Sequence, residues 1–222
     1  RFKPQYFVSS VKGEVSGHVK TQGVWSEQLK RIDIRQLNAA GFINNKPIRG
    51  RGNLTLLLDS NQKGFLPQQF EANDLYFSYA QNQLQATGNA QSLKIKLNAP
   101  ALYELYPGLK GRAYGSLNVQ SQPRLKAIAN IAVDNFAFKD VASVRSLRIQ
   151  GELPTSETIP TLLVAKIDHL RSGNREIENA TVNLAGTRKA HVLKVESKNR
   201  QSNLYVQLAG GFNSNNEWLG QL

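Results

Sequence analysis

Hydrophobic and polar residues alternate with a period of two along most of this chain. The clearest run follows Pro107-Gly108, where one set of alternate positions is apolar or small and the other is polar or bulky. The apolar set is Leu109, Gly111, Ala113, Gly115, Leu117 and Val119. Successive side chains of a β-strand point to opposite faces, so this pattern predicts a strand with one apolar face and one solvated face.

The same alternation recurs in more than ten short segments separated by turn residues. This spacing is typical of consecutive antiparallel hairpins. A degenerate repeat accompanies it, because several segments contain an apolar residue, a spacer and a glycine: Ile149-Gln150-Gly151, Leu184-Ala185-Gly186 and Leu208-Ala209-Gly210. The pattern predicts an all-β protein built as one long antiparallel meander.

Two local features interrupt the alternation. Residues 100–106 predict one short helix, because proline suits a first helical turn and Pro107-Gly108 ends the run. The apolar phase also changes between residues 70–72 and residues 75–79. An extra residue in one strand produces such a shift, so this change predicts a bulge or bend.

The apolar positions hold mainly Leu, Ile, Val, Ala and Gly, with few aromatic residues. In a sandwich or a small barrel, large side chains from opposed faces fill the interior. A single long sheet that bends on itself would instead leave an apolar trough. The pattern leaves both possibilities open, a trough for a hydrocarbon-like ligand and an ordinary packed core.

The balance of charges is strongly basic. The 222 residues include 28 Lys and Arg against 16 Asp and Glu, a formal net charge of +12. Such a charge favours acidic partners, namely nucleic acid, anionic lipid or an acidic protein. The basic residues are nevertheless spread singly along the predicted strands, as in Leu93-Lys94-Ile95-Lys96-Leu97. This spacing is typical of a solvated outer face and argues against nucleic acid as a partner.

Other features bear on class and origin. The chain contains no cysteine, which excludes disulfides and cysteine-bound zinc. It also contains no methionine, no signal-peptide pattern and no apolar run of the roughly 20 residues that a membrane helix needs. We therefore expect an excised segment of a longer protein, forming a single elongated unit over residues 1–222 with a weak internal division near residues 98–109.

No constellation of catalytic residues is evident. The three histidines, His18, His169 and His191, lie far apart and in strand-like contexts. Glu176 and Glu178 would share a face, but Arg175 beside them favours simple charge balance. Nothing in the sequence assembles a nucleophile, a base and an oxyanion donor, so we expect no enzymatic activity, no metal and no cofactor.

The order of several motifs resembles the TamB family, and the resemblance spans most of the chain. Its main landmark is the run from Ala99 to Gly111, followed by Gly115-Ser116-Leu117. Two further landmarks precede this run, namely Gly13-Glu14-Val15-Ser16-Gly17 and Gly50-Arg51-Gly52-Asn53-Leu54. Three follow it in order, namely Leu147 to Leu153, Val182 to Thr187 with Ala190-His191, and Trp218-Leu219-Gly220. Each motif is only a glycine and aliphatic pattern, so the resemblance depends on their order and spacing together.

The resemblance implies a specific fold and setting. It implies a sheet curled into a half-open tube with a hydrophobic groove, called a β-taco, as in AsmA-like and bridge-like lipid-transfer proteins. It implies a C-terminal-region fragment of a periplasmic protein that is anchored in the inner membrane of a Gram-negative bacterium. It further implies a TamA-type barrel in the outer membrane as partner, and roles in assembling outer-membrane proteins or moving phospholipid.

We therefore expect a non-enzymatic conduit segment whose groove binds phospholipid acyl chains. The candidate groove-lining residues are Leu54, Leu56, Leu93, Ile95, Leu117, Val119, Ile131, Val133, Leu147, Ile149, Val182, Leu184, Leu193, Val195, Leu204, Val206 and Leu208. The alternative is a chaperone-like module that holds nascent outer-membrane strands at an open sheet edge. A β-solenoid enzyme acting on polysaccharide would need clustered carboxylates and stacking aromatics, which the sequence lacks.

Overall fold

The protein is described by a computed structural model that places residue 3 and residues 12–26, 29–59, 69–89, 91–120, 126–153, 159–199, 202–213 and 217–221. The chain divides into two compact units, Arg1–Ala99 and Pro100–Leu222. Almost every element in the described residues is a β-strand. None of the described helical segments has the length and apolar character needed to cross a bilayer.

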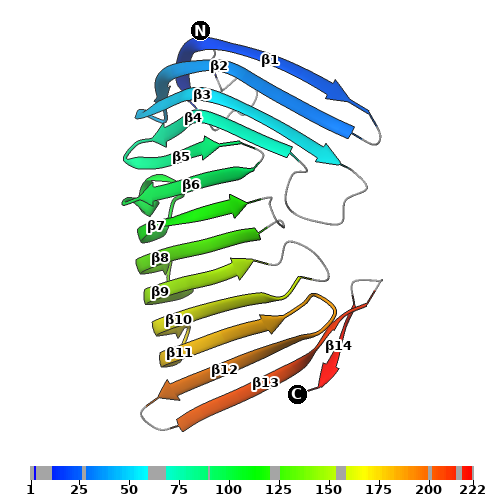
Figure 1. The fold of residues 1–222 in the computed structure, drawn as a ribbon. Coiled ribbons are helices and arrows are strands. Elements are labelled where there is room, and N and C mark those ends of the chain that lie inside the picture. The colour runs from blue at the N-terminus through cyan, green and yellow to red at the C-terminus, as the bar shows by residue number, and fades with distance from the viewer. Residues whose placement is uncertain are drawn as a thin grey trace. The chain divides into compact units, whose positions relative to one another are not determined.

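Unit 1 is an antiparallel meander of six strands (Figure 1). The strands are β1 (Gly13–Trp25), β2 (Leu29–Ile43), β3 (Lys46–Asp59), β4 (Gln69–Tyr79), β5 (Asn82–Gly88) and β6 (Ser92–Ala99). Each strand pairs with the next one along the chain. A turn at Asn44-Asn45 joins β2 to β3.

Unit 2 repeats this arrangement with eight strands after one short helical turn. The elements are η2 (Leu102–Glu104), β7 (Leu109–Gln120), β8 (Lys126–Phe138), β9 (Ala142–Leu153), β10 (Thr161–Ser172), β11 (Arg175–Gly186), β12 (His191–Asn199), β13 (Ser202–Phe212) and β14 (Trp218–Gln221). Among the described residues, β1 pairs with β2 alone and β14 with β13 alone, so neither sheet closes into a barrel. The prediction of an all-β antiparallel meander is confirmed.

The helix expected over residues 100–106 is much shorter than predicted. Only Leu102–Glu104 is helical, as a 3₁₀ turn in which the Glu104 N–H donates to Ala101 O at 3.1 Å and the Leu105 N–H to Leu102 O at 3.0 Å. Pro107-Gly108 ends the segment almost at once, and a single turn with i to i+3 bonds is the form that such short stretches adopt. The turn buries Ala101 and Leu102.

Bulges with left-handed backbone conformations interrupt the strands of unit 1 at neighbouring levels. Gln36 has a φ of 53°, Gly52 of 111° and Asp74 of 48°. The pairing register shifts at each of these places, in β2, β3 and β4 respectively. Because such bulges bend and twist a strand, aligned bulges bend neighbouring strands together. The bulge predicted from the change of phase in residues 70–79 is confirmed.

A similar pair of bulges lies in unit 2, between β7 and β8. Gly111 has a φ of 101° and Asn135 a φ of 50°, and the register shifts between Lys110 and Arg112. The extra residue belongs to β8, so β7 keeps the alternation expected from Leu109, with Lys110, Arg112 and Tyr114 exposed between less exposed neighbours. A side chain at Gly111 would collide with the backbone carbonyl oxygens of Asp134 and Asn135, which explains the glycine in physical terms.

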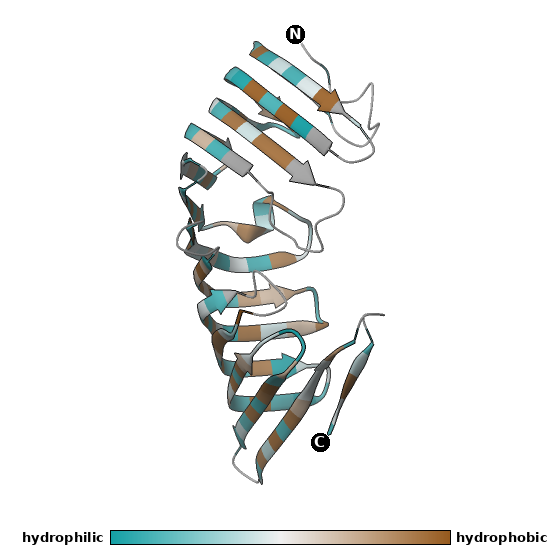
Figure 2. Ribbon diagram, turned by 45° about the vertical axis from the view of Figure 1, so that its right-hand side comes forward, coloured by the Kyte–Doolittle hydropathy of each residue, from teal (hydrophilic) through white to brown (hydrophobic). Residues whose placement is uncertain are grey.

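Each unit is a single layer of sheet. Hydrophobic and hydrophilic residues alternate along its strands, as Figure 2 shows. The principal contacts between described elements of either unit join sheet neighbours, or join η2 to β7. Among the described residues, the largest side chain that is fully buried belongs to Val119. The described residues therefore contain no second layer packed against an apolar face.

Candidate functional site

The strand register gathers the predicted residues of unit 2 on one face of its sheet. Residues that lie directly opposite each other in antiparallel strands share a face. Following the partners from β7 to β13 gives three rows that cross seven strands. The rows are Ala113–Val133–Leu147–Ile167–Ala180–Ser197–Leu204, Gly115–Ile131–Ile149–Ala165–Val182–Val195–Val206, and Leu117–Ala129–Gly151–Leu163–Leu184–Leu193–Leu208.

We call the surface formed by these three rows the apolar face of unit 2. It contains twelve of the thirteen candidate residues in this unit, and the thirteenth, Val119, extends it opposite Ala127. Ser197 is its one polar side chain. The alternation seen in each strand thus becomes a continuous surface, because the register keeps all the apolar positions in phase.

This surface is partly open to solvent. Val119 is 1% exposed and Leu204 is 56% exposed, and the other candidate residues of unit 2 are half-buried. Neighbouring strands shield the sides of these side chains, while no described layer covers their ends. An apolar surface of this size that lacks a second layer is characteristic of a binding surface.

Glycines leave gaps within the apolar face. Gly151 lies between Ala129 and Leu163 in its row, and Gly115 lies opposite Ile131. The φ of Gly151 is 143°, and a Cβ there would collide with the carbonyl oxygen of Leu162. These positions accept no larger residue without a backbone shift, so the apolar face has shallow depressions between its aliphatic side chains.

The four candidate residues of unit 1 also share a face of their sheet. Leu54 lies opposite Ile34 and Ala72, and Leu56 lies opposite Ile32. Leu93 and Ile95 on β6 lie opposite Gly88 and Ala86 on β5. Leu93 is 8% exposed and the other three are half-buried. We call this surface the apolar face of unit 1.

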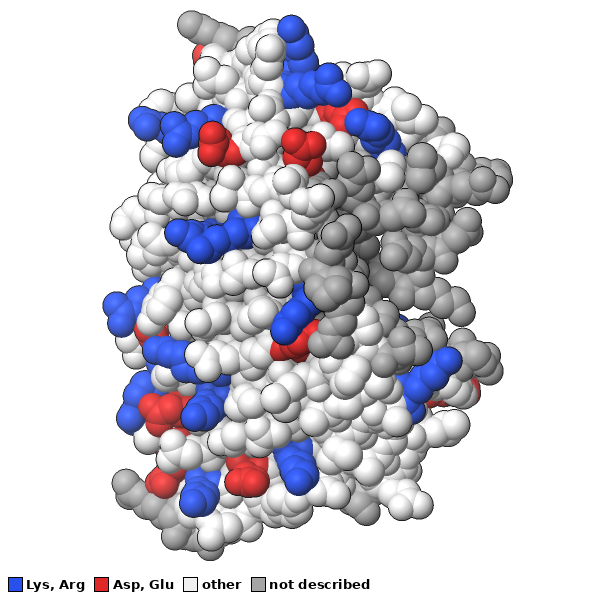
Figure 3. Space-filling model, viewed as in Figure 1, with Lys and Arg blue, Asp and Glu red and all other residues white. Residues whose placement is uncertain are grey.

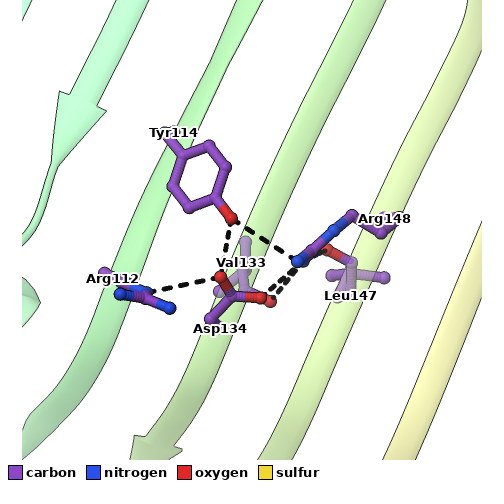
Figure 4. A network of polar contacts seen from close by, with 6 residues as sticks. All are labelled: Arg112, Tyr114, Val133, Asp134, Leu147 and Arg148. Carbon is purple, nitrogen blue, oxygen red and sulfur yellow. Dashed lines mark hydrogen bonds and ion pairs between the residues drawn. The ribbon is translucent and has the colours of Figure 1, made fainter.

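On the opposite face of unit 2, three polar side chains form a network around one buried carboxylate (Figure 4). Asp134 on β8 is 7% exposed. Its Oδ1 lies 2.6 Å from Nη1 of Arg148, and its Oδ2 accepts hydrogen bonds from the Tyr114 hydroxyl at 2.7 Å and from Nε of Arg112 at 3.3 Å. These residues come from β7, β8 and β9, so the network ties three strands together.

Arg148 also connects this network to the backbone behind the apolar face. Its Nη1 donates to the carbonyl oxygens of Val133 at 3.3 Å and Leu147 at 3.1 Å. Val133 and Leu147 are directly paired and belong to the apolar face. The guanidinium therefore holds the backbone that positions two candidate residues.

The electrostatics of the network follow from these contacts. The hydrogen bond from Arg148, followed by that from Tyr114, lowers the pKa of Asp134 below its usual value. The same carboxylate raises the pKa of the Tyr114 hydroxyl, which donates to it, and raises the pKa of Arg148. The network is therefore an ionised structural brace at neutral pH.

A smaller acidic centre lies in unit 1. Asp33 on β2 is 3% exposed, and its Oδ2 accepts a hydrogen bond from Nε of Arg31 at 3.0 Å. This bond, with a further one from Thr55, lowers the pKa of Asp33. On the face that Figure 3 shows, basic side chains are interspersed with acidic ones and separated by uncharged surface.

The histidines do not form a joint site. Nδ1 of His169 lies 2.7 Å from Oδ1 of Asp168, while Nε2 of His191 accepts a hydrogen bond from Nε1 of Trp218 at 3.2 Å. The described residues contain no group of three or more His, Cys, Asp or Glu side chains that could hold a metal ion.

Sequence reasoning missed one part of the apolar face and the polar network on the opposite face. Leu163 belongs to the apolar face, but it lies in the unbroken apolar run from Leu162 to Ala165, where alternation gives no phase. Register resolves the phase, because it places Leu162, which is 60% exposed, on the opposite face. The network around Asp134 was also missed, since its members lie on different strands and no sequence signal pairs them.

Comparison with known proteins gives a consistent assignment. A family model described as "TamB, N-terminal domain" matches residues 2–222. The chain is 25% identical over 228 residues to the "Translocation and assembly module subunit TamB" of Haemophilus influenzae, an alignment that covers 98% of this chain and 16% of the relative. No solved structure matches the chain. Because the matching model describes an N-terminal domain, the expectation of a C-terminal-region fragment is wrong.

Proposed function

The chain belongs to the TamB family, and from this premise we propose that it is a non-enzymatic conduit segment that binds phospholipid acyl chains along its apolar faces. The proposed setting is the periplasm of a Gram-negative bacterium, in a longer protein that is anchored in the inner membrane. A TamA-type outer-membrane barrel is the proposed partner of that protein. The proposed role is the transport of lipid between the two membranes and the biogenesis of the outer membrane.

The observation that carries this proposal is the apolar face of unit 2, against which no second layer of described residues packs. Its rows cross seven strands, and at about 4.8 Å between strands they extend about 29 Å. An acyl chain spans one leaflet, about 15 Å of the bilayer's hydrocarbon core. The surface is therefore long enough to hold an acyl chain lying across the strands.

The energetics favour a hydrocarbon occupant. Each methylene that leaves water contributes about 0.8 kcal/mol, so even a partly covered acyl chain gains several kcal/mol against the entropy of ordering it. Aliphatic side chains offer no polar group that would need a partner. The lipid headgroup would stay in water, where lysine and arginine side chains at the rim could lie along the wall and meet its charge.

A second candidate function has one observation in its favour. The edge strand β14 pairs only with Ala209 to Phe212 of β13. Across the described residues, the outer edge of β13 from Ser202 to Leu208 therefore has no strand beside it. A nascent outer-membrane strand could pair with these backbone groups, which is the chaperone-like alternative.

Native mass spectrometry of the purified chain tests for phospholipid that co-purifies with it. Photo-crosslinking then locates the cargo, with a crosslinker at Val182 on the apolar face and a matched control at the neighbouring Asn183 on the opposite face. Lipid captured at Val182 and not at Asn183 supports the conduit. Polypeptide captured at Tyr205 on the β13 edge, without lipid at Val182, supports the alternative. Equal capture of lipid at Val182 and Asn183 contradicts the conduit.

A further inference from the structure

A cleft lies in unit 1 on the face opposite to its apolar face. It has a volume of about 650 Å³, and the side chains that line it include Arg51, Tyr76, Lys94 and Lys96. Arg51 is paired with Tyr76, Tyr76 with Gln85, and Gln85 with Lys96, so these four residues form one row across β3 to β6. Gln85 and Lys96 alternate with Ala86 and Ile95, which places the row on the polar side.

The bulges of unit 1 lie at this cleft. Gly52 and Asp74, two of the left-handed residues, are among its lining. A Cβ on Gly52 would lie 2.6 Å from the Cα of Leu75, so the backbones approach closely here. The hollow therefore follows from bends in β3 and β4 that the glycine permits. A second hollow of about 320 Å³ adjoins it, shares Arg51 and Tyr76, and adds Arg49.

The charge of this cleft is strongly positive. Arg49, Arg51, Lys94 and Lys96 line the two hollows, and Asp74 is the one acidic residue among their described lining residues. Within the described part of the chain, no carboxylate forms an ion pair with any of these four cations. Arg51 instead lies over the Tyr76 ring, with its Cζ 5.2 Å from the ring centroid, a contact that fixes the plane of the guanidinium.

The outer cations can converge on one ligand. Three strand spacings separate Arg51 from Lys96, about 14 Å at about 4.8 Å each. Both side chains are long, so their charged ends can reach toward the middle of the row from opposite sides. Gln85 and Thr87 lie between them and supply neutral hydrogen-bond donors.

We propose that the polar face of unit 1 carries a binding cleft for a phosphate ester. A phosphate offers several charged acceptor oxygens, and an arginine fork beside two lysines gives it several charge-assisted hydrogen bonds. The volume lies within the range of small-molecule sites and exceeds the needs of an inorganic ion, so the ligand carries an organic group on its phosphate. This inference is independent of acyl-chain binding, because it concerns the opposite face of the sheet.

Phosphate esters can reach the cleft from two sources, as free soluble molecules or as lipid headgroups. Glycerol 3-phosphate probes the first source, in a ¹H–¹⁵N NMR titration of the chain at low ionic strength. Phosphatidylcholine vesicles with and without phosphatidic acid probe the second, in a flotation assay. The expected result in the titration is a set of shifts confined to amides of β3 to β6.

Variants locate the site. Arg51→Gln with Lys96→Gln removes both ends of the row and is expected to weaken binding about tenfold or more. The matched control, Lys166→Gln with Lys198→Gln, removes the same charge from exposed positions on the polar face of unit 2, and is expected to change binding less than about twofold. Lys94→Gln with Lys96→Gln replaces the first pair if that pair disturbs the spectrum of the folded chain.

Each outcome decides the proposal. Glycerol 3-phosphate binding that the cleft variant loses identifies a soluble ester as the ligand class. Binding only to vesicles that contain phosphatidic acid, again lost in the cleft variant, identifies a membrane headgroup. Absence of binding to both probes overturns the proposal. Equal weakening by the control pair also overturns it, because the attraction would then come from net charge alone.

Discussion

Asp134 and Arg148 are held 2.6 Å apart, between Oδ1 and Nη1, on neighbouring strands of unit 2. Their sequence neighbours Val133 and Leu147 are directly paired and point to the other side of the sheet. Arg148 donates to the carbonyl oxygens of both neighbours. One ion pair on the polar face thus fixes the backbone beneath an apolar pair that belongs to the candidate lipid site.

Removing the carboxylate is expected to destabilise unit 2. Asp134→Ala leaves Tyr114 and two arginines without their shared acceptor, and should lower the free energy of unfolding by about 1–2 kcal/mol. We expect a value near the lower end of this range, because water still solvates part of both arginine side chains. Urea unfolding of the chain measures this change. Asp140→Ala is the matched control, because Asp140 lies exposed in the turn after β8 and should cost less than about 0.5 kcal/mol. Equal effects of the two variants would show that the network adds nothing to stability.

The same carboxylate predicts how stability depends on pH. The pKa of Asp134 is lowered in the folded chain from an ordinary value of 3.8, so the folded state holds its proton less strongly than the unfolded state. Its contribution is therefore present above about pH 4 and is lost as the pH falls through the lowered pKa. The stability difference between the native chain and Asp134→Asn should shrink as the pH falls from about 6 to about 3. A difference that stays constant over this range would contradict the predicted linkage.

A charge placed in the middle of the apolar face tests the candidate lipid site. Ile149 is half-buried in the central row, so Ile149→Glu should retain the β-sheet circular dichroism spectrum. Co-purifying phospholipid should fall about tenfold or more, because an ionised carboxylate would have to lose water against the acyl chain. Gln150→Glu adds the same charge on the opposite face and should leave the lipid unchanged. Wholesale unfolding of Ile149→Glu would instead indicate a closed core.

The glycines of the apolar face are expected to tolerate no side chain where the backbone is left-handed. Gly151→Ala would bring a Cβ against the carbonyl oxygen of Leu162 at a φ of 143°. It should lower the free energy of unfolding by more than about 1 kcal/mol. Gly23→Ala is the control, since its Cβ would meet nothing closer than Arg31 O at 3.6 Å. Thermal unfolding of both variants compares them, and an unchanged melting temperature for Gly151→Ala would contradict the expectation.

The sequence predicted strand phases well where apolar and polar residues alternate cleanly. Ile131, Ile149 and Val182 lie on three different strands, yet their phases agreed with the register that the structure shows. The change of phase before Leu75 also predicted the bulge at Asp74. Both inferences depend only on the two-residue period, which local sequence contains in full.

Other features depended on information that a single segment does not contain. Arg112 and Arg148 contact Asp134 across two strand pairs. The sequence of one strand does not determine its register with the next, so these contacts could not be predicted. Leu162 and Leu163 stand side by side in an apolar run, so only pairing with β9 shows which of them faces outward. The helix was overestimated because seven residues form little more than one turn, and a stretch this short closes with i to i+3 bonds instead of a full α-helical ladder.

The pairing of every strand with its sequence neighbours within each unit gives the sheet a modular architecture. Inserting or deleting one hairpin would change its width by about 9.6 Å and leave the other ladders in register. In a fold whose connections cross between distant strands, inserting or deleting a hairpin would change which strands are neighbours throughout the domain. Evolution can therefore adjust the width of such a sheet in increments of one hairpin.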